Sequence, residues 1–171
     1  MGNMIGLNPS TSGGTCLQMS NGLTDVFLNV LVLGGSALAK TVSEKRLIVW
    51  LAERDQSRVG MGTVGFDLRD MPWAPASFAR DREFLLCVAA GARERMGWEK
   101  LDYHPNEKLL FPCLDRFAEL VGEMAFSEIK ADALEEWLLG ADVSDPVLCG
   151  FPLCPRHQTL LTVFGCHICN N

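Results

Sequence analysis

Clustered lysine and arginine are absent from the second half of this 171-residue sequence. Residues 99–145 hold four Lys/Arg against twelve Asp/Glu, a balance of −8, whereas residues 40–98 hold ten against eight, a balance of +2. Beyond residue 130, Arg156 is the only Lys or Arg. Binding to DNA or RNA needs basic side chains gathered at the phosphates, so we expect no nucleic-acid partner.

The sequence also lacks a typical targeting signal or membrane span. Its most apolar run, residues 26–39, ends in Ala-Leu-Ala like a signal-peptidase site. No Lys or Arg precedes the run, however, and Asp25 stands where a signal peptide has its positive region. The run is too short to cross a bilayer, and Asn29 interrupts it. We therefore expect a cytoplasmic protein with no membrane partner.

Familiar catalytic signatures are missing as well, since neither G-x-S-x-G nor H-E-x-x-H occurs. Residues 60–65 match G-x-G-x-x-G, but a predicted helix precedes them and a turn follows. A dinucleotide site needs the opposite order, a strand and then a helix whose N-terminal amides meet the pyrophosphate. We interpret these glycines as a bend that glycine permits.

One pair of carboxylates is the best candidate for acid–base or metal chemistry. Asp67 and Asp70 stand three residues apart beside Trp73, and two carboxylates that converge in a cleft can catalyse hydrolysis. A small hydrolase or transferase is the alternative function that this pair suggests. Aspartate is equally an ordinary residue of solvated turns.

Seven cysteines are present, an odd number that does not suit a secreted disulfide framework. Cys87 and Cys113 fall within apolar helical patterns, where a free thiol behaves as a small hydrophobic group. Cysteine is crowded only near the end of the chain, after residue 148. This distribution favours a reducing compartment and a metal site.

The crowded segment reads C-P-R-H, eight residues, then C-H-I-C. Each pair with two residues between its members presents two side chains to one point, and three thiolates with one imidazole fill a tetrahedral zinc shell. We predict a structural Zn²⁺ ion held by four side chains: Cys154, His157, Cys166 and Cys169. His167 is an alternative to His157, and Cys149 to Cys154, each with poorer pairing geometry.

Hydrophobic periodicity predicts a mainly α fold, α+β with a minor β component. Helices are expected at five places: about residues 24–33, 41–55, 75–96, 105–124 and 132–140. The first also reads as a buried strand because of its valines. Thr41 with Glu44 forms a capping box, and Asp132 with Glu135 an acidic version of it. The last helix is expected to bury Leu134, Trp137 and Leu138.

Composition divides the chain into three parts. Residues 1–22 are rich in Gly, Ser, Thr and Asn and predict a flexible tail. Residues 23–148 are expected to form a single helical domain, and residues 149–171 a C-terminal zinc-binding hairpin or knuckle, with alternating Leu160, Thr162 and Phe164 in its arm. A helical body with a cysteine–histidine tail resembles the layout of some small bacterial proteins, and this resemblance implies no particular function.

The acidic second half suggests a function through its charge. Asp115, Glu119 and Glu123 recur at helical spacing and predict a stripe along one helix. Such a field speeds encounter with a basic partner, although it is equally typical of a solvated surface. We expect a non-enzymatic protein-binding module, in one version an immunity protein that blocks a basic nuclease toxin.

Overall fold

The computed structural model describes residues 2–8 and 15–170. Its described part contains five α-helices: α1 (Asn21–Leu38), α2 (Val42–Ala52), α3 (Phe78–Arg93), α4 (Glu107–Glu123) and α5 (Ala133–Leu139). It also contains short strands: β1 (Gly2–Leu7), β2 (Thr15–Ser20), β3 (Asp55–Gln56), β4 (Gly62–Thr63) and β5 (Phe66–Asp67). The predicted class, mainly helical with a minor β component, agrees with this content.

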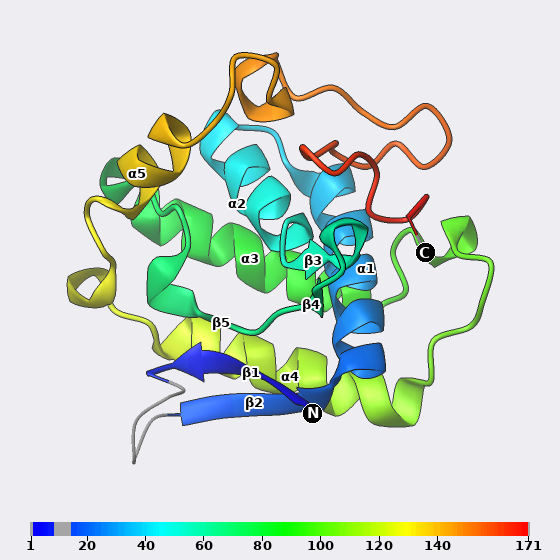
Figure 1. Cartoon of the computed structure of the whole chain (residues 1–171). Helices are drawn as coiled ribbons and strands as arrows, with labels where there is room; N and C mark the ends of the chain where they lie inside the picture. Colours follow the sequence, from blue (N-terminus) through cyan, green and yellow to red (C-terminus); the bar gives the residue numbers. More distant parts are fainter. Residues whose placement is uncertain (1, 9–14, 171) are drawn as a thin grey trace.

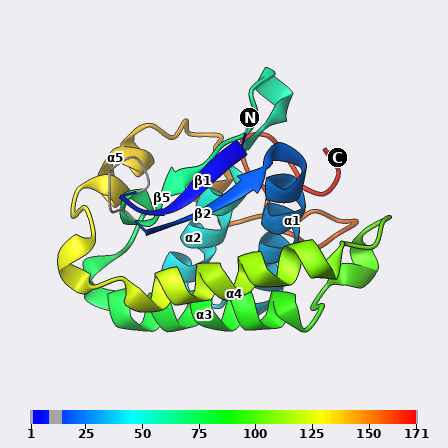
Figure 2. The same cartoon turned by 90° about the horizontal axis from the view of Figure 1, so that it is seen from below.

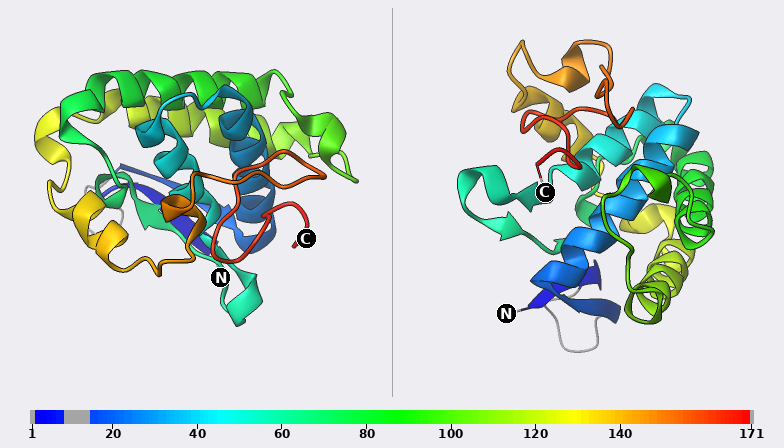
Figure 3. Two further views of the ribbon diagram at one scale, coloured as in Figure 1. Left: turned by 90° about the horizontal axis from the view of Figure 1, so that it is seen from above. Right: turned by 90° about the vertical axis from the view of Figure 1, so that its right-hand side faces the viewer.

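Helix α1 stands at the centre of the fold and packs against α2, α3 and α4 (Figure 1). Helices α3 and α4 lie side by side as one layer, and α4 also packs against β1 and β2 (Figure 2). The C-terminal segment lies across the upper part of α1, on the opposite side of the molecule from the β1–β2 hairpin (Figure 3). The C-terminal segment therefore rests on a helix of the core.

The prediction of a flexible tail over residues 1–22 is wrong for the strands found there. Strands β1 and β2 pair antiparallel, and β5 joins β1 in parallel, giving the sheet order β2-β1-β5. Alternate side chains of the hairpin face the core, so Ile5, Leu17 and Met19 are buried. The side chain of Asn3 donates hydrogen bonds to Thr24 of α1 and Thr63 of β4. Residues 1 and 9–14 of the predicted tail lie outside the described residues, and the helical domain cannot begin at residue 23.

The helix predictions are mostly confirmed, because local signals define the ends. The first segment is helix and not strand, and α2 begins at the predicted capping box, in which Thr41 accepts from the Glu44 amide and Glu44 from the Thr41 amide. Helix α5 differs from prediction. Asp132 makes no side-chain cap, and Leu134, Trp137 and Leu138 are only half-buried. The short α5 lies at the edge of the molecule (Figure 1), and its residues are half-buried or exposed.

Helix α1 is long and apolar enough to cross a membrane by length and composition alone. About half of it, 56%, is buried inside the fold, and the core helix of a soluble protein passes the same test. Length and composition of α1 are therefore weak evidence for a membrane span.

Gly65 marks the closest approach of β5 to β1, and we expect its substitution by alanine to be destabilising. A Cβ atom at Gly65 would overlap the backbone of Met4, which has no flexible end to move aside. We expect Gly65→Ala to lower the free energy of unfolding by roughly 1–3 kcal/mol, the usual cost of overpacking. Urea unfolding of both proteins measures the change.

Gly122→Ala serves as the matched control for this substitution. Gly122 lies inside α4, and nothing stands within 4 Å of the position where its Cβ would lie. Alanine there should stabilise the protein by about 0.5–1 kcal/mol, because it reduces the conformational entropy of the unfolded chain. A Gly65→Ala protein as stable as the parent would contradict the close packing of β1 on β5.

Candidate metal centre

The four predicted ligands come together at the C-terminal end of the chain. Their ligand atoms all lie within 4.8 Å of one another. A tetrahedral zinc site with the usual Zn–S and Zn–N distances has edges of about 3.8 Å between sulfurs and about 3.6 Å between sulfur and nitrogen. Here Cys154 Sγ lies 3.8 Å from Cys169 Sγ, and 3.7 Å from His157 Nδ1. These side chains are therefore close together in a geometry suitable for a metal ion.

His157 faces the other ligands through its Nδ1 atom. This nitrogen lies 3.6 Å from Cys166 Sγ and 3.3 Å from Cys169 Sγ. The sequence motif indicated the residue, and the structure adds which ring nitrogen faces the centre. A metal ion here would meet Nδ1 and leave Nε2 for an outer contact.

Two short turns bring the ligands together. Gln158 closes the first turn with a hydrogen bond from its amide to the Cys154 carbonyl, 2.7 Å long, so that Cys154 and His157 point the same way. The spacer then turns back at Gly165, which has a φ of 88° that glycine adopts readily. Isolated bridges join Leu153 to Leu160 and Thr162 to Gly165, and no regular strand is found in this described segment.

Backbone and side-chain donors surround the sulfur atoms. The amide of Cys169 donates to Cys166 Sγ at 3.4 Å, and Thr159 Oγ1, which is fully buried, lies 3.1 Å from the same sulfur. Burial opposes ionisation of Cys154, but the amides of His157 and Arg156 outweigh it and lower the pKa of its thiol to about 6. Partial burial and the neighbouring thiols raise the pKa of Cys169 to about 11. A bound cation would favour the thiolate form of Cys169.

The centre packs on the core of the protein. Cys154, Cys166 and Ile168 form a buried apolar cluster with Leu33 of α1. The amide of Leu160 also donates to the Ser36 hydroxyl of α1, over 3.0 Å. An ion that holds the two ends of the segment together would therefore also hold the segment on α1.

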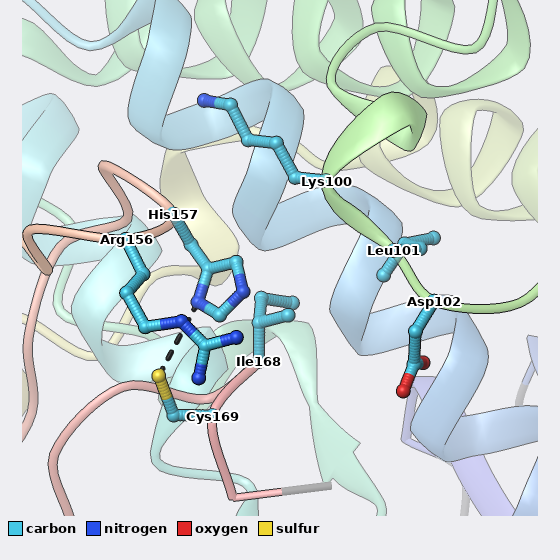
Figure 4. Close-up of a pocket in the computed structure, with 7 residues that line it drawn as sticks. All are labelled: Lys100, Leu101, Asp102, Arg156, His157, Ile168 and Cys169. Atoms are coloured by element: carbon cyan, nitrogen blue, oxygen red, sulfur yellow. Dashed lines mark hydrogen bonds between the residues drawn. The ribbon is translucent and has the colours of Figure 1, made fainter.

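One side of the centre opens into a pocket of about 230 Å³ (Figure 4). The chain after α3 forms one wall with Lys100, Leu101 and Asp102, and the C-terminal segment forms the other with residues that include His157 and Cys169. Cys169 is the exposed ligand of the four, so this pocket is where solvent meets the centre.

The two alternative ligands lie elsewhere. Cys149 is exposed, and its sulfur lies 3.5 Å from the Val143 carbonyl. His167 turns into the interior, where its Nδ1 lies 3.4 Å from Asp55 Oδ2 of β3 and where Asp25 of α1 completes a buried cluster. Burial, opposed by the Asp55 carboxylate, lowers the pKa of His167 to about 4. His167 thus anchors the C-terminal segment to the body.

Asp67 and Asp70 do not converge in a pocket that the structure describes. Arg69 binds Asp67 in a bidentate ion pair, with a shortest distance of 2.6 Å, and Lys130 pairs with Asp70. Burial opposes ionisation of Asp67, but its hydrogen bonds and charge contact with Arg69 hold its pKa below the usual range. Trp73 is fully buried and donates its indole N–H to the Leu68 carbonyl, so it belongs to the core.

The two cysteines expected on apolar helix faces differ in exposure. Cys113 is buried, its sulfur faces the Leu109 carbonyl, and burial raises the pKa of its thiol. Cys87 is exposed, which differs from the apolar position expected for it.

The glycines of residues 60–65 close a 3-10 turn and enter β4. Only another 3-10 turn follows them, whereas a dinucleotide site requires an α-helix.

Glu53, which sequence reasoning placed only near the carboxylate pair Asp67 and Asp70, is buried in a second pocket. Burial raises the pKa of its carboxyl group to about 7, although the Trp137 indole N–H and Arg54 act against this shift. Trp137 comes from α5, 84 positions later in the chain. A helix-end glutamate gives no local signal of such a contact.

No family model, no curated protein and no solved structure matches the chain.

Proposed function

We propose that the metal centre holds a structural zinc ion. Three thiolates and one imidazole are the usual donors of structural zinc sites, and the observed spacing fits zinc bond lengths. Four protein ligands leave no position for the metal-bound water that a catalytic zinc needs. The role of the ion is then to fix residues 149–171 against α1.

We further propose that the chain is a non-enzymatic module that binds a basic protein. The observation that carries this proposal is the acidic face, defined as residues 131–145. It holds five Asp/Glu and no Lys or Arg. Four of its acids are exposed, and none of the ion pairs within the described residues involves them: Asp132, Glu135, Glu136 and Asp142. Charge that is not neutralised internally is available to a partner.

The acidic face also carries an apolar groove of about 330 Å³. Leu134, Leu138 and Leu139 of α5 line it together with Ala131 and Glu135, and Leu139 is 78% exposed. Apolar contact supplies affinity, and the surrounding carboxylates supply orientation and a faster encounter. The occupant that fits both features is a basic amphipathic segment of another protein.

The acidic stripe along α4 should attract a basic partner less strongly than the sequence suggested. Arg93 pairs with Asp115 at 2.8 Å, and Arg116 pairs with Glu119 at 2.7 Å. These arginines neutralise two of the three carboxylates of the stripe, so the attraction to a basic partner is centred on the acidic face. One version of the proposal is a cytoplasmic inhibitor that blocks a basic nuclease toxin, as immunity proteins do.

Partner capture with matched variants tests this function. The zinc-loaded chain is used to retain proteins from the source cell at low and at high salt. We expect the retained partner to be basic and to dissociate at high salt. Leu139→Ser combined with Glu135→Lys should abolish retention, because it removes an apolar contact and reverses a charge on the acidic face.

Two controls locate the surface. Val59→Ser combined with Glu83→Lys makes the same kinds of change at exposed positions outside the acidic face and should leave retention unchanged. The triple change of Asp115, Glu119 and Glu123 to Lys should have the smaller effect. Retention that survives the acidic-face variant and is lost with the triple change would show that the α4 stripe is the binding surface.

A further inference from the structure

A second pocket, of about 410 Å³, is lined in part by residues of the acidic face. It is enclosed by α5 and the chain that follows it, by the end of α2 with β3, and by the turn of the C-terminal segment. Its lining includes four carboxylates, two aromatic rings and one arginine: Glu53, Glu136, Asp142, Asp145, Trp137, Phe164 and Arg54. Three separate parts of the chain thus meet around one acidic cavity.

Two of these carboxylates are buried. Glu53 is 8% exposed and accepts a hydrogen bond of 2.9 Å from the Trp137 indole N–H. Asp145 is 6% exposed and accepts from the Val147 amide at 3.0 Å. The Asp145 charge adds to the effect of burial on Glu53 and favours its protonated form. Buried carboxylates are costly unless cations pair with them.

The single cation of the lining, Arg54, acts on Glu53 through its charge but makes its close contacts with Trp50. The guanidinium of Arg54 lies over the Trp50 ring, 3.9 Å from its centroid, and its Nε donates to the Trp50 carbonyl. One arginine also cannot balance four carboxylates. The pocket is therefore complementary to an additional positive charge.

We propose that this pocket binds the guanidinium group of an arginine side chain that the basic partner presents. The cavity is larger than a single metal ion needs, and its lining includes Trp137 and Phe164, aromatic residues of the kind on which a flat cation can stack. The planar fork of guanidinium also matches carboxylate oxygens in pairs. This inference rests on the proposed function, since it names the group by which the partner is anchored next to the acidic face.

The Trp137 indole N–H reports on the pocket directly. In a ¹H–¹⁵N spectrum of the zinc-loaded chain, Trp137→Phe assigns its signal among the four tryptophans. The probe is a capped peptide of alternating glycine and arginine, and its matched control is the same peptide with citrulline, which has nearly the same shape and no charge. We expect the arginine peptide to shift the Trp137 signal saturably and the citrulline peptide to leave it in place.

Variants test which residue carries the binding. Glu53→Gln keeps an acceptor for Trp137 and removes one charge, so the affinity for the arginine peptide should fall at least about tenfold. Asp145→Asn, which keeps the acceptor for Val147, should weaken binding in the same direction. Glu83→Gln makes the same charge change at an exposed position of α3 and should leave the affinity unchanged.

Three results would overturn the inference: equal shifts by both peptides, parental affinity in Glu53→Gln, or a shift produced by Mg²⁺ or Ca²⁺ alone. Each of these can occur while partner retention still depends on Leu139 and Glu135. Failure of the arginine pocket is therefore distinguishable from failure of the proposed function.

Discussion

Replacing Cys166 by serine is expected to release the zinc ion that we propose for this centre and to loosen residues 149–170. A serine hydroxyl does not ionise near neutral pH and is a poor substitute for a thiolate ligand. Loss of contacts outside the ligand shell already costs ~10–100-fold in metal affinity, so loss of a ligand should cost more than about a hundredfold. The Sγ atom of Cys166 also accepts a hydrogen bond from the Cys169 amide and lies close to the Thr159 hydroxyl.

The expected damage is local. The helices bury their own apolar faces in the main core, which does not include Cys154 or Cys166. Loosening of the segment would expose Leu33 of α1, because this side chain packs against Cys154, Cys166 and Ile168. Metal analysis should give about one zinc per parent chain and almost none in the variant. Amide hydrogen exchange should rise over residues 149–170 and much less in α3 and α4.

Cys149→Ser provides the matched control. It makes the same chemical change in an exposed cysteine that lies outside the four-residue cluster, so zinc content and exchange should stay at parental values. Stoichiometric zinc in Cys166→Ser, or no zinc in freshly reduced parent protein, would contradict the assignment of the centre.

The gathering of the four cysteine and histidine side chains was predictable because its signal is local. Two short spacings placed all four ligands, and the same tight turns that the spacing predicts bring their atoms together. The capping box at Thr41 defined the start of α2 for the same reason. Sequence also raised the choice between His157 and His167, but only the fold decides it, because Asp55 lies 112 positions before His167.

The β1–β2 hairpin and the pocket around Glu53 were not predictable in this way. The hairpin alternates Leu17 and Met19 toward the core, a pattern hidden in a segment whose composition favours disorder. Its third strand, β5, comes about 60 positions after β1, so no local signal announces the sheet. Glu53 and Trp137 meet only because α5 folds back on the end of α2.

Glu53→Gln is expected to stabilise the protein at pH 8 and to have little effect at pH 5. Burial raises the pKa of Glu53 to about 7 in the folded state, from 4.5 as its ordinary value. The folded protein therefore binds this proton more tightly than the unfolded chain does. The contribution of the protonated Glu53 carboxyl group to the free energy of unfolding is fully present below about pH 4.5. It is lost as the pH rises through 7.

The size of the effect follows from the shift. A difference of about 2.5 pKa units corresponds to about 3 kcal/mol at pH values above 7. Glutamine carries no charge and still accepts from Trp137, so at pH 8 the variant should be more stable than the parent by up to about 3 kcal/mol. At pH 5 the difference should shrink to less than about 1 kcal/mol. Urea unfolding of both proteins at the two pH values measures it.

The same measurement links stability to binding. Glu83→Gln makes the same change at an exposed position and is the matched control. A parent protein as stable as Glu53→Gln at pH 8 would contradict the raised pKa. With the arginine peptide present at about a hundred times its dissociation constant, the parent should gain about 2.7 kcal/mol and the weaker-binding variant less. The difference in free energy of unfolding between Glu53→Gln and the parent at pH 8 should therefore become smaller when the peptide is added. The reason is that the guanidinium group of the peptide supplies a positive charge to pair with the buried carboxylate.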